Sequence, residues 1–373
     1  MGGPAPIACY YRGVVKPSHK PVDKPPAASQ TPREIYEQLD RFVIGQERAK
    51  RVVSLAAYNH LKRIAARSTR ARGVLKKSNI LLIGPTGSGK THIAKNLADV
   101  LHLPFTIADA TEYTEAGYYG KDVEVMVAEL LFKSNHSIED TQKGIIFIDE
   151  IDKIARRSHG ARTGAGSRDI GGEGVQQSLL KLLEGREIFV PLNVTQHWNK
   201  HDFVQIDTTD ILFICAGTFS DLHSYDGDKA LGFGAVTRGG RRRRISNKDL
   251  LEYGMLAEFL GRLPLVVELT ALSEDDLLQI LTVPPDSILR EYEELLALDD
   301  IRLEFAEEGL RKVVHYAVDK GLGARGLRAI LEEVMHDVMF EAPERRGSTI
   351  AIDAALVAAR LEAIDPAHLA VDR

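Results

Sequence analysis

Residues 84–91 have the composition and spacing of a loop that binds phosphate groups. They match the pattern GxxxxGK[ST] and are Gly84, Pro85, Thr86, Gly87, Ser88, Gly89, Lys90 and Thr91. Glycines allow successive backbone N–H groups to converge on phosphate oxygens, and a helix that follows points the positive end of its dipole at them. In such a loop the lysine reaches the β- and γ-phosphates and the threonine ligates Mg²⁺. The loop therefore predicts binding of ATP with Mg²⁺; a chance glycine-rich turn is the alternative.

Two carboxylates follow an apolar segment further along the chain. Asp149 and Glu150 come directly after residues 144–148, which have the composition of a buried strand. At the carboxyl end of a strand, Asp149 is placed to hold Mg²⁺ through its water shell and Glu150 to polarise an attacking water. Such a pair on its own is often only a solvated strand end. Its position downstream of the phosphate loop predicts ATP hydrolysis.

These side chains need a scaffold, and the sequence predicts a parallel sheet. Apolar, largely β-branched runs at residues 79–83, 145–148 and 211–215 alternate with segments of helical periodicity. Strands that alternate with helices are typical of an α/β fold with a doubly wound parallel sheet and helices on both faces. Thr31 and Pro32 have the types of a helix N-cap and a first helical residue.

The chain divides into two predicted domains. From about residue 269 the pattern becomes mainly helical, with helices expected at 275–281, 286–298, 307–320 and 324–340. We therefore expect a large ATPase domain at 31–267 and a smaller helical C-terminal domain at 268–365. Residues 1–30, which are rich in proline, and residues 366–373 are expected to be disordered tails.

The overall composition narrows the class of protein. The 373 residues, 44% hydrophobic and 27% charged, are typical of a soluble globular protein. A net charge of −5 argues against binding nucleic acid through bulk charge. The two cysteines, Cys9 and Cys215, cannot build a disulfide framework or a four-cysteine zinc site. No apolar run approaches the ~20 residues of a membrane span, and no secretory signal is visible. We expect a cytoplasmic protein with no membrane partner.

Taken together, the motifs resemble the AAA+ family and, within it, the ClpX group of protein-unfolding ATPases. The resemblance extends from about residue 31 to residue 365. Besides the phosphate loop and the acidic pair, it rests on residues 43–47, 117–120, 172–177, 231–234, 258–264 and 323–328. The related HslU unfoldases share the nucleotide motifs but lack the Leu-Gly-Phe tripeptide. The resemblance implies an AAA+ large domain followed by a small, mainly helical one.

The resemblance implies roles for five further residues. Val43 and Ile44 correspond to apolar contacts with adenine, although core packing alone would also account for them. Arg262 corresponds to the arginine finger that acts on a neighbouring subunit's nucleotide, where a guanidinium offsets charge in the transition state. Arg325 corresponds to a second sensor arginine that couples domain rotation to the nucleotide, and Thr218 is a candidate γ-phosphate sensor. Without the resemblance, either arginine is an ordinary surface cation.

Two loops carry features expected of substrate handling. Tyr118 and Tyr119 lie between glycines, and a glycine-flanked aromatic loop can grip an extended chain; a buried tyrosine turn is the alternative. In the family this motif is Gly-Tyr-Val-Gly and lines the pore, so Tyr119 is a departure that leaves substrate choice open. Residues 194–201 lack the family's basic Arg-Lys-His triplet. The i,i+4 pair His197 and His201 makes a metal site there a weaker alternative, and we predict no zinc site.

A third loop is expected to bind a partner protein. Leu231, Gly232 and Phe233 form an apolar tripeptide within a polar stretch, and the resemblance implies that it docks into a hydrophobic cleft of a ClpP-type peptidase. The alternative is that it folds back onto its own domain. We interpret the arginine run at 241–244 as a solvated part of this loop rather than a nucleic-acid site. The family's N-terminal four-cysteine zinc module has no counterpart in residues 1–30.

These observations predict an ATP-driven protein unfoldase with ATP and Mg²⁺ as cofactors. It would form a homohexameric ring and thread protein substrates into a ClpP-type peptidase, because a finger that acts on a neighbour requires a closed ring. Three alternatives stay open: a remodelling chaperone that needs no peptidase, a regulatory paralogue that co-assembles with a fuller family member, and a nucleic-acid-linked AAA+ motor. The aromatic and Leu-Gly-Phe loops favour protein over nucleic acid as the substrate.

Overall fold

The computed structural model describes residues 30–66, 76–114, 121–156, 170–192, 203–220, 222 and 244–363. Several sequence predictions lie outside these residues. They are residues 1–29 of the N-terminal tail, Tyr118 and Tyr119, residues 194–201, the tripeptide at 231–233, most of the arginine run, and the C-terminal tail.

A five-stranded parallel sheet forms the centre of the larger part of the molecule. Its strands, in spatial order, are β2 (Phe105–Asp109), β3 (Ile145–Asp149), β6 (Leu212–Gly217), β1 (Ile80–Ile83) and β7 (Leu265–Glu268). In register, Ile80 pairs with Ile214 on one side and Leu265 on the other. All four residues of β1 are buried, which is expected of a strand covered on both faces. The predicted α/β fold with a parallel sheet is confirmed.

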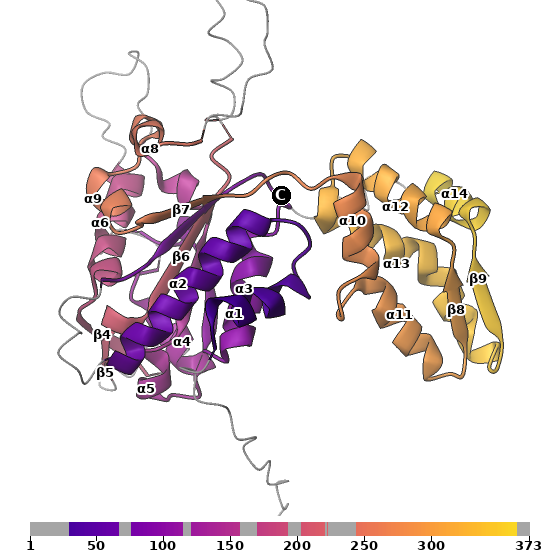
Figure 1. Cartoon of the computed structure of the whole chain (residues 1–373), viewed down its shortest axis with the longest axis horizontal. Helices are drawn as coiled ribbons and strands as arrows, with labels where there is room; N and C mark the ends of the chain where they lie inside the picture. Colours follow the sequence, from indigo (N-terminus) through magenta and orange to yellow (C-terminus); the bar gives the residue numbers. More distant parts are fainter. Residues whose placement is uncertain are drawn as a thin grey trace, which may run out of the picture.

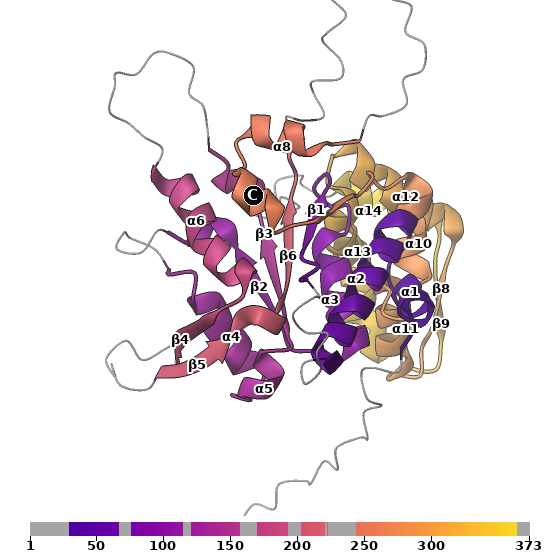
Figure 2. The same ribbon diagram turned by 60° about the vertical axis from the view of Figure 1, so that its left-hand side comes forward.

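Two helical layers cover the sheet (Figures 1 and 2). One face packs against α1 (Pro32–Asp40), α2 (Glu47–Ala65) and α3 (Lys90–Leu101) in one hydrophobic core. The other face packs against α4 (Val125–Lys133), α6 (Ile170–Glu184), α8 (Asn247–Tyr253), α9 (Ala257–Gly261) and the hairpin of β4 (Glu187–Pro191) and β5 (Phe203–Asp207). The short helix α5 (Ile138–Thr141) contacts α4. Alternate residues of the central strands supply the two cores, so the sheet separates them.

Local capping explains where the first described helix, α1, begins. The side chain of Thr31 accepts a hydrogen bond from the Glu34 N–H, and Glu34 accepts one from the Thr31 N–H at 2.7 Å. With Pro32 as its first residue, α1 begins where the sequence predicted, and Glu34 adds a capping box that was not predicted.

A smaller helical part follows β7 and has its own core (Figure 1). It contains α10 (Glu274–Thr282), α11 (Ile288–Ala297), α12 (Glu307–Asp319), α13 (Gly323–Glu341) and α14 (Ala354–Ala363). The first four are the helices predicted from periodicity. Two short parallel strands, β8 (Arg302–Phe305) and β9 (Thr349–Ile352), were not predicted. We call residues 269–273, which join β7 to α10, the hinge segment.

Candidate nucleotide-binding site

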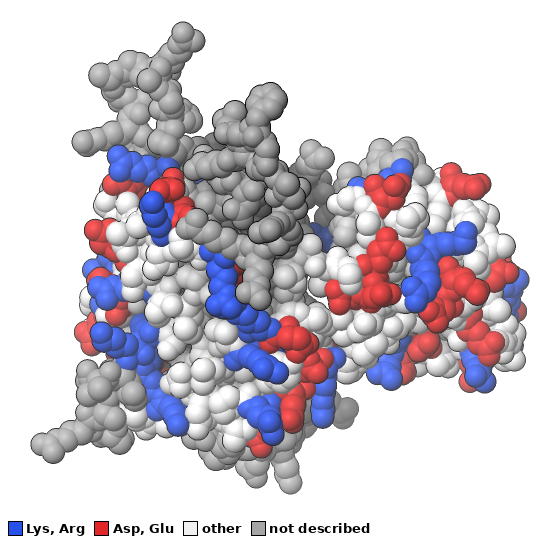
Figure 3. Space-filling model, turned by 45° about the horizontal axis from the view of Figure 1, so that its top comes forward, with Lys and Arg blue, Asp and Glu red and all other residues white. Residues whose placement is uncertain are grey.

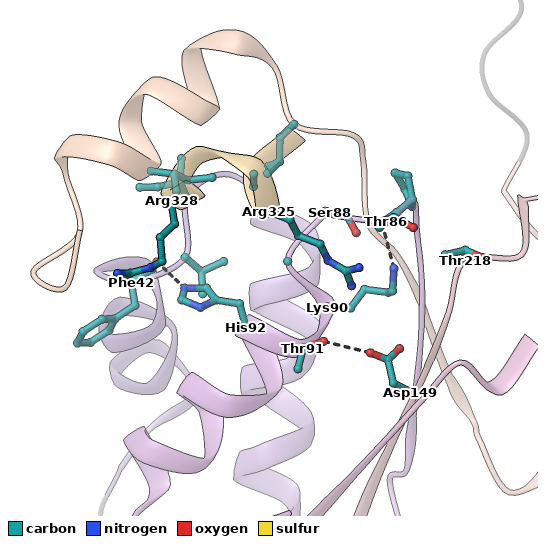
Figure 4. A pocket seen from close by; sticks show the side chains of 18 of the residues that line it. Phe42, Thr86, Ser88, Lys90, Thr91, His92, Asp149, Thr218, Arg325 and Arg328 are labelled. Atoms are coloured by element: carbon teal, nitrogen blue, oxygen red, sulfur yellow. Dashed lines mark hydrogen bonds between the residues drawn. The ribbon is translucent and has the colours of Figure 1, made fainter. Parts of the chain in front are cut away.

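A pocket of about 810 Å³ lies at the carboxyl ends of the central strands, between the sheet and the helical part (Figure 4). Ligands of parallel α/β sheets bind at this edge. Nearly all residues predicted for a nucleotide site line it: Val43, Ile44, Pro85, Thr86, Gly87, Ser88, Gly89, Lys90, Thr91, Asp149, Glu150, Thr218 and Arg325. Gly84 lies at the base of the loop, where an added Cβ would stand 2.9 Å from the Cβ of Leu269. Five separate segments of the chain thus meet in one cavity.

The phosphate loop (residues 84–91) has the backbone of an anion-binding turn. Gly87 and Gly89 have φ values of 77° and 92°, in the left-handed region that glycine adopts without strain. Gly89 caps α3, so the free N–H groups of that helix face the pocket. The Oγ of Ser88 is buried and has no hydrogen-bond partner among the residues that the structure describes. A bound phosphate group would supply the missing partners.

Lys90 is the buried cation of the pocket, with 8% of its surface exposed. Its Nζ donates hydrogen bonds to the carbonyl oxygens of Gly84 at 2.7 Å and Pro85 at 3.0 Å. Burial lowers the pKa of Lys90; Asp149 opposes this shift and Arg325 adds to it. An anion at this position would offset the cost of burying the ammonium group.

Asp149 and Glu150 end β3 at the edge of the pocket. The Oγ1 of Thr91 donates a hydrogen bond to Oδ2 of Asp149 at 3.3 Å, which brings together the two oxygen ligands predicted for Mg²⁺ (Figure 4). Hydroxyl and carboxylate oxygens suit this hard cation, so the residues present fit it. Glu150 has a left-handed φ of 54°, a conformation that costs a non-glycine residue about 1–3 kcal/mol. Its side chain is exposed at the pocket.

Asp152 is a pocket residue to which the sequence analysis assigned no role. It is 7% exposed, and its Oδ2 accepts hydrogen bonds from Thr218 Oγ1 at 2.8 Å and from the Phe219 N–H at 3.4 Å. An added Cβ on Gly217 would come within 2.7 Å of its Oδ1. Asp152 therefore fixes the Thr218 hydroxyl at the end of β6. The only sequence signal was a third carboxylate just after the acidic pair.

The two predicted arginines occupy different places. Arg325, on the first turn of α13, lines the pocket and points toward Lys90 (Figure 4). Arg262, at the end of α9, is absent from the described residues that line this pocket. Its guanidinium lies 2.6 Å from the carboxylate of Glu184 at the end of α6, and both side chains are about half exposed. Arg262 thus pairs with Glu184 and does not line the nucleotide pocket of its own chain.

Residues 42–46, here called the base loop, supply three apolar residues, Phe42, Val43 and Ile44, to the wall of the pocket. Val43 is 3% exposed, and both Ile44 and Phe42 line the cavity. Two side chains hold the backbone of this loop. Lys50 donates to the Val43 carbonyl oxygen at 3.1 Å, and the His92 ring bonds the Phe42 carbonyl oxygen at 3.1 Å. Neither Phe42 nor His92 was predicted: each is adjacent to a predicted residue, Val43 or Thr91, but lies just outside the motif.

Comparison with known proteins agrees with this geometry. The AAA domain family (Cdc48 subfamily) matches residues 75–266, and the family of the C-terminal, D2-small domain of ClpB protein matches residues 272–352. The ATP-dependent Clp protease ATP-binding subunit ClpX 2 of Wolinella succinogenes is 48% identical over 318 residues, which cover 85% of this chain and 79% of the relative. This chain belongs to the ClpX family. The ClpX subunit of Treponema denticola is 44% identical over 339 residues, covering 88% of this chain and 81% of that relative.

The described residues of this ClpX-family chain contain neither a membrane-spanning helix nor a cluster of metal ligands. None of the helices placed there is long and apolar enough to cross a membrane. Within those same ranges, no group of three or more His, Cys, Asp or Glu side chains gathers in a metal-binding arrangement. The His197 and His201 pair lies outside the described residues.

Proposed function

We propose that this protein hydrolyses ATP to unfold other proteins and passes them through a homohexameric ring into a ClpP-type peptidase in the cytoplasm. The observation that carries the proposal is the pocket in which the phosphate loop, Asp149, Glu150 and Arg325 meet. Relatives at 48% and 44% identity are named ATP-binding subunits of an ATP-dependent Clp protease, which supports the same function.

The pocket's residues suit the steps of ATP hydrolysis. The N–H groups of the phosphate loop and the Lys90 ammonium bind the phosphates, while Phe42 to Ile44 contact the base. Thr91 and Asp149 hold Mg²⁺, which when bound neutralises phosphate charge. Glu150, exposed beside Asp149, takes a proton from the attacking water. Lys90, Thr91, Asp149 and Glu150, to which these roles are assigned, all line the cavity.

Completion of the site requires a second copy of the chain. Arg262 does not line its own pocket and is half exposed beside Glu184, and we propose that it leaves this ion pair to contact the nucleotide of a neighbour. A heterologous contact whose rotation closes gives a ring, in which every site receives one arginine. Arg325 comes from the helical part and is the sensor within the same chain.

The parts of the proposal that concern substrate and peptidase rest on sequence. Tyr118 and Tyr119 are proposed to grip substrate in the pore, and the tripeptide Leu231, Gly232 and Phe233 to dock on the peptidase. The division into domains at 31–267 and 268–365 is also proposed; the family matches at 75–266 and 272–352 support it.

A regulatory or peptidase-independent role is the second candidate. It is favoured by Tyr119 in place of the family's valine and by the lack of a basic triplet in residues 194–201. A nucleic-acid motor is less favoured, since acidic and basic side chains are interspersed over the described surface drawn in Figure 3.

One experiment separates these functions. ATPase rate and degradation of a folded, tagged reporter are measured with and without a ClpP-type peptidase, and the ATPase rate is also measured with DNA. Degradation only with ATP and peptidase supports the proposal. Unfolding without any effect of the peptidase supports the remodelling chaperone, and strong stimulation by DNA supports the nucleic-acid motor.

A further inference from the structure

Gln46 joins three functional segments through one side-chain amide. Its Nε2 donates hydrogen bonds to the carbonyl oxygen of Ser88 in the phosphate loop at 3.2 Å and to that of Thr270 in the hinge segment at 2.7 Å. Its Oε1 accepts a hydrogen bond from the Thr270 N–H at 3.1 Å. Gln46 itself is the last residue of the base loop and the N-cap of α2. We call this set of three bonds the Gln46 bridge.

The bridge uses both donors and the acceptor oxygen of the Gln46 side-chain amide. The two Nε2 hydrogens go to two carbonyls, and Oε1 accepts from a backbone N–H. The Gln46 amide bonds both the carbonyl oxygen and the N–H of Thr270, and these two bonds fix the amide in one orientation. Gln46 has a left-handed φ of 55°, a costly conformation for a residue other than glycine. Neither a carboxylate nor an apolar side chain could make all three bonds.

The hinge segment lies against the phosphate loop beside this bridge. The Leu269 N–H donates to the Ile83 carbonyl oxygen at 2.7 Å, directly before Gly84. On the other side of the hinge, an added Cβ on Gly45 would lie 3.4 Å from Oδ1 of Asp276 in the first turn of α10. The base loop is therefore packed against the start of the helical part, and Thr270 lies at the junction.

We propose that Gln46 is a positioning residue that transmits nucleotide occupancy of the pocket to the hinge segment, and so sets where Arg325 stands. The inference rests on the proposed ATPase function. A nucleotide that contacts both the base loop and the phosphate loop fixes the positions of Gln46 and of the Ser88 carbonyl. The hydrogen bonds between Gln46 and Thr270 then fix the position of Thr270 in the hinge segment. A ligand shifts a conformational equilibrium only through contacts that differ between the two states, and the bridge supplies such a contact to the hinge.

The structure separates this role from nucleotide binding itself. Lys50 and His92 hold the base loop through the Val43 and Phe42 carbonyls, and neither bond involves Gln46. The phosphate loop keeps its glycine turns and Lys90. Loss of the bridge should therefore leave ATP affinity nearly intact and lower kcat, because Arg325 is no longer held in place.

The test replaces Gln46 with methionine, which has a similar length and makes none of the three bonds. We expect Gln46→Met to keep the dissociation constant for ATP within about threefold while kcat falls roughly tenfold, equivalent to about 1.4 kcal/mol in activation free energy. Arg48→Met is the matched control, because Arg48 is an exposed residue in the first turn of the same helix, and it should retain wild-type values. If Gln46→Met does not fold, Gln46→Glu, which keeps the acceptor for the Thr270 N–H, is judged by the same criteria.

The second readout follows the hinge directly. Dye pairs are attached at Lys95→Cys on α3 and Glu294→Cys on α11, both exposed sites, in a Cys9→Ser background. Cys215 is fully buried, and burial raises its pKa, so it stays unlabelled. Labelled subunits are diluted into unlabelled ones of the same variant. ATP should change energy transfer in the wild type and in Arg48→Met, and change it by less than a third as much in Gln46→Met.

The outcomes separate this inference from the proposed function. Wild-type kcat and a wild-type change in energy transfer in Gln46→Met would overturn the role of Gln46 and leave the ATPase intact. Loss of ATP affinity and kcat in equal measure would show that Gln46 serves binding alone, which also overturns it. Absence of ATP hydrolysis by the wild-type protein would instead refute the proposed function.

Discussion

Replacement of Arg262 by alanine should separate stability from catalysis. The guanidinium lies 2.6 Å from Glu184, but both side chains are about half exposed. Exposed ion pairs contribute about 0–1 kcal/mol, so the free energy of unfolding should fall by no more than that. In other nucleotide hydrolases an arginine finger raises kcat by roughly 10³–10⁵-fold. We expect Arg262→Ala to bind ATP and form rings but to lose about 10³-fold in kcat, equivalent to about 4 kcal/mol.

The assay compares three proteins by denaturant unfolding, ATP binding and steady-state ATPase. Glu184→Ala is the control, since it breaks the same ion pair and keeps the guanidinium, and its kcat should stay within about fivefold of wild type. Mixing Arg262→Ala with Glu150→Gln subunits should restore some hydrolysis, because each supplies what its neighbour lacks. A near-normal ATPase rate in Arg262→Ala would refute the role of the finger. If mixed rings form but no mixture hydrolyses ATP, the proposal that Arg262 acts on a neighbouring subunit is refuted.

Four further predictions follow from individual residues. Glu150→Gln should bind ATP normally and lose roughly 10²–10⁴ in turnover, since the general base is gone, and Lys90→Ala should lose ATP binding itself, as measured by nucleotide titration. Phe233→Ala should keep ATPase activity and lose association with the peptidase; unchanged degradation would refute the docking role. His60 is buried with its pKa lowered to about 3 by burial and by Arg63, so it stays neutral in the folded protein. The unfolded chain binds the proton below about pH 6.5, so the free energy of unfolding should fall from there toward pH 3 by up to about 1.4 kcal/mol per pH unit. His60→Gln should reduce that slope in denaturant titrations, and an unchanged slope would refute the assignment.

The central strands and the phosphate loop could be predicted because their signals are local. Strands β1, β3 and β6 are continuous apolar runs bounded by glycine or polar residues, and both of their faces are buried. The phosphate loop is one contiguous motif that lines the pocket as expected from Pro85 to Thr91.

The features that were missed depend on contacts between distant residues. β2 and β7 are short edge strands with partly exposed residues, so their pattern is weak. β8 and β9 pair in parallel although Arg302 and its partner Thr349 are far apart in sequence. Gln46 was recognised only as part of a motif, because its bonds to Ser88 and Thr270 span 42 and 224 residues. Propensity and periodicity carry no information on such contacts.

The most direct test of the central claim is unfolding of a stable, tagged fluorescent protein by the purified ring, followed as loss of fluorescence. A trap that captures unfolded reporter makes the loss irreversible. We predict that fluorescence falls with ATP and Mg²⁺, that it stays constant with ADP, and that Glu150→Gln rings bind the reporter but do not unfold it. Steady ATP hydrolysis by rings that leave the reporter folded, across tags of different charge, would contradict the claim that this ATPase is a protein unfoldase.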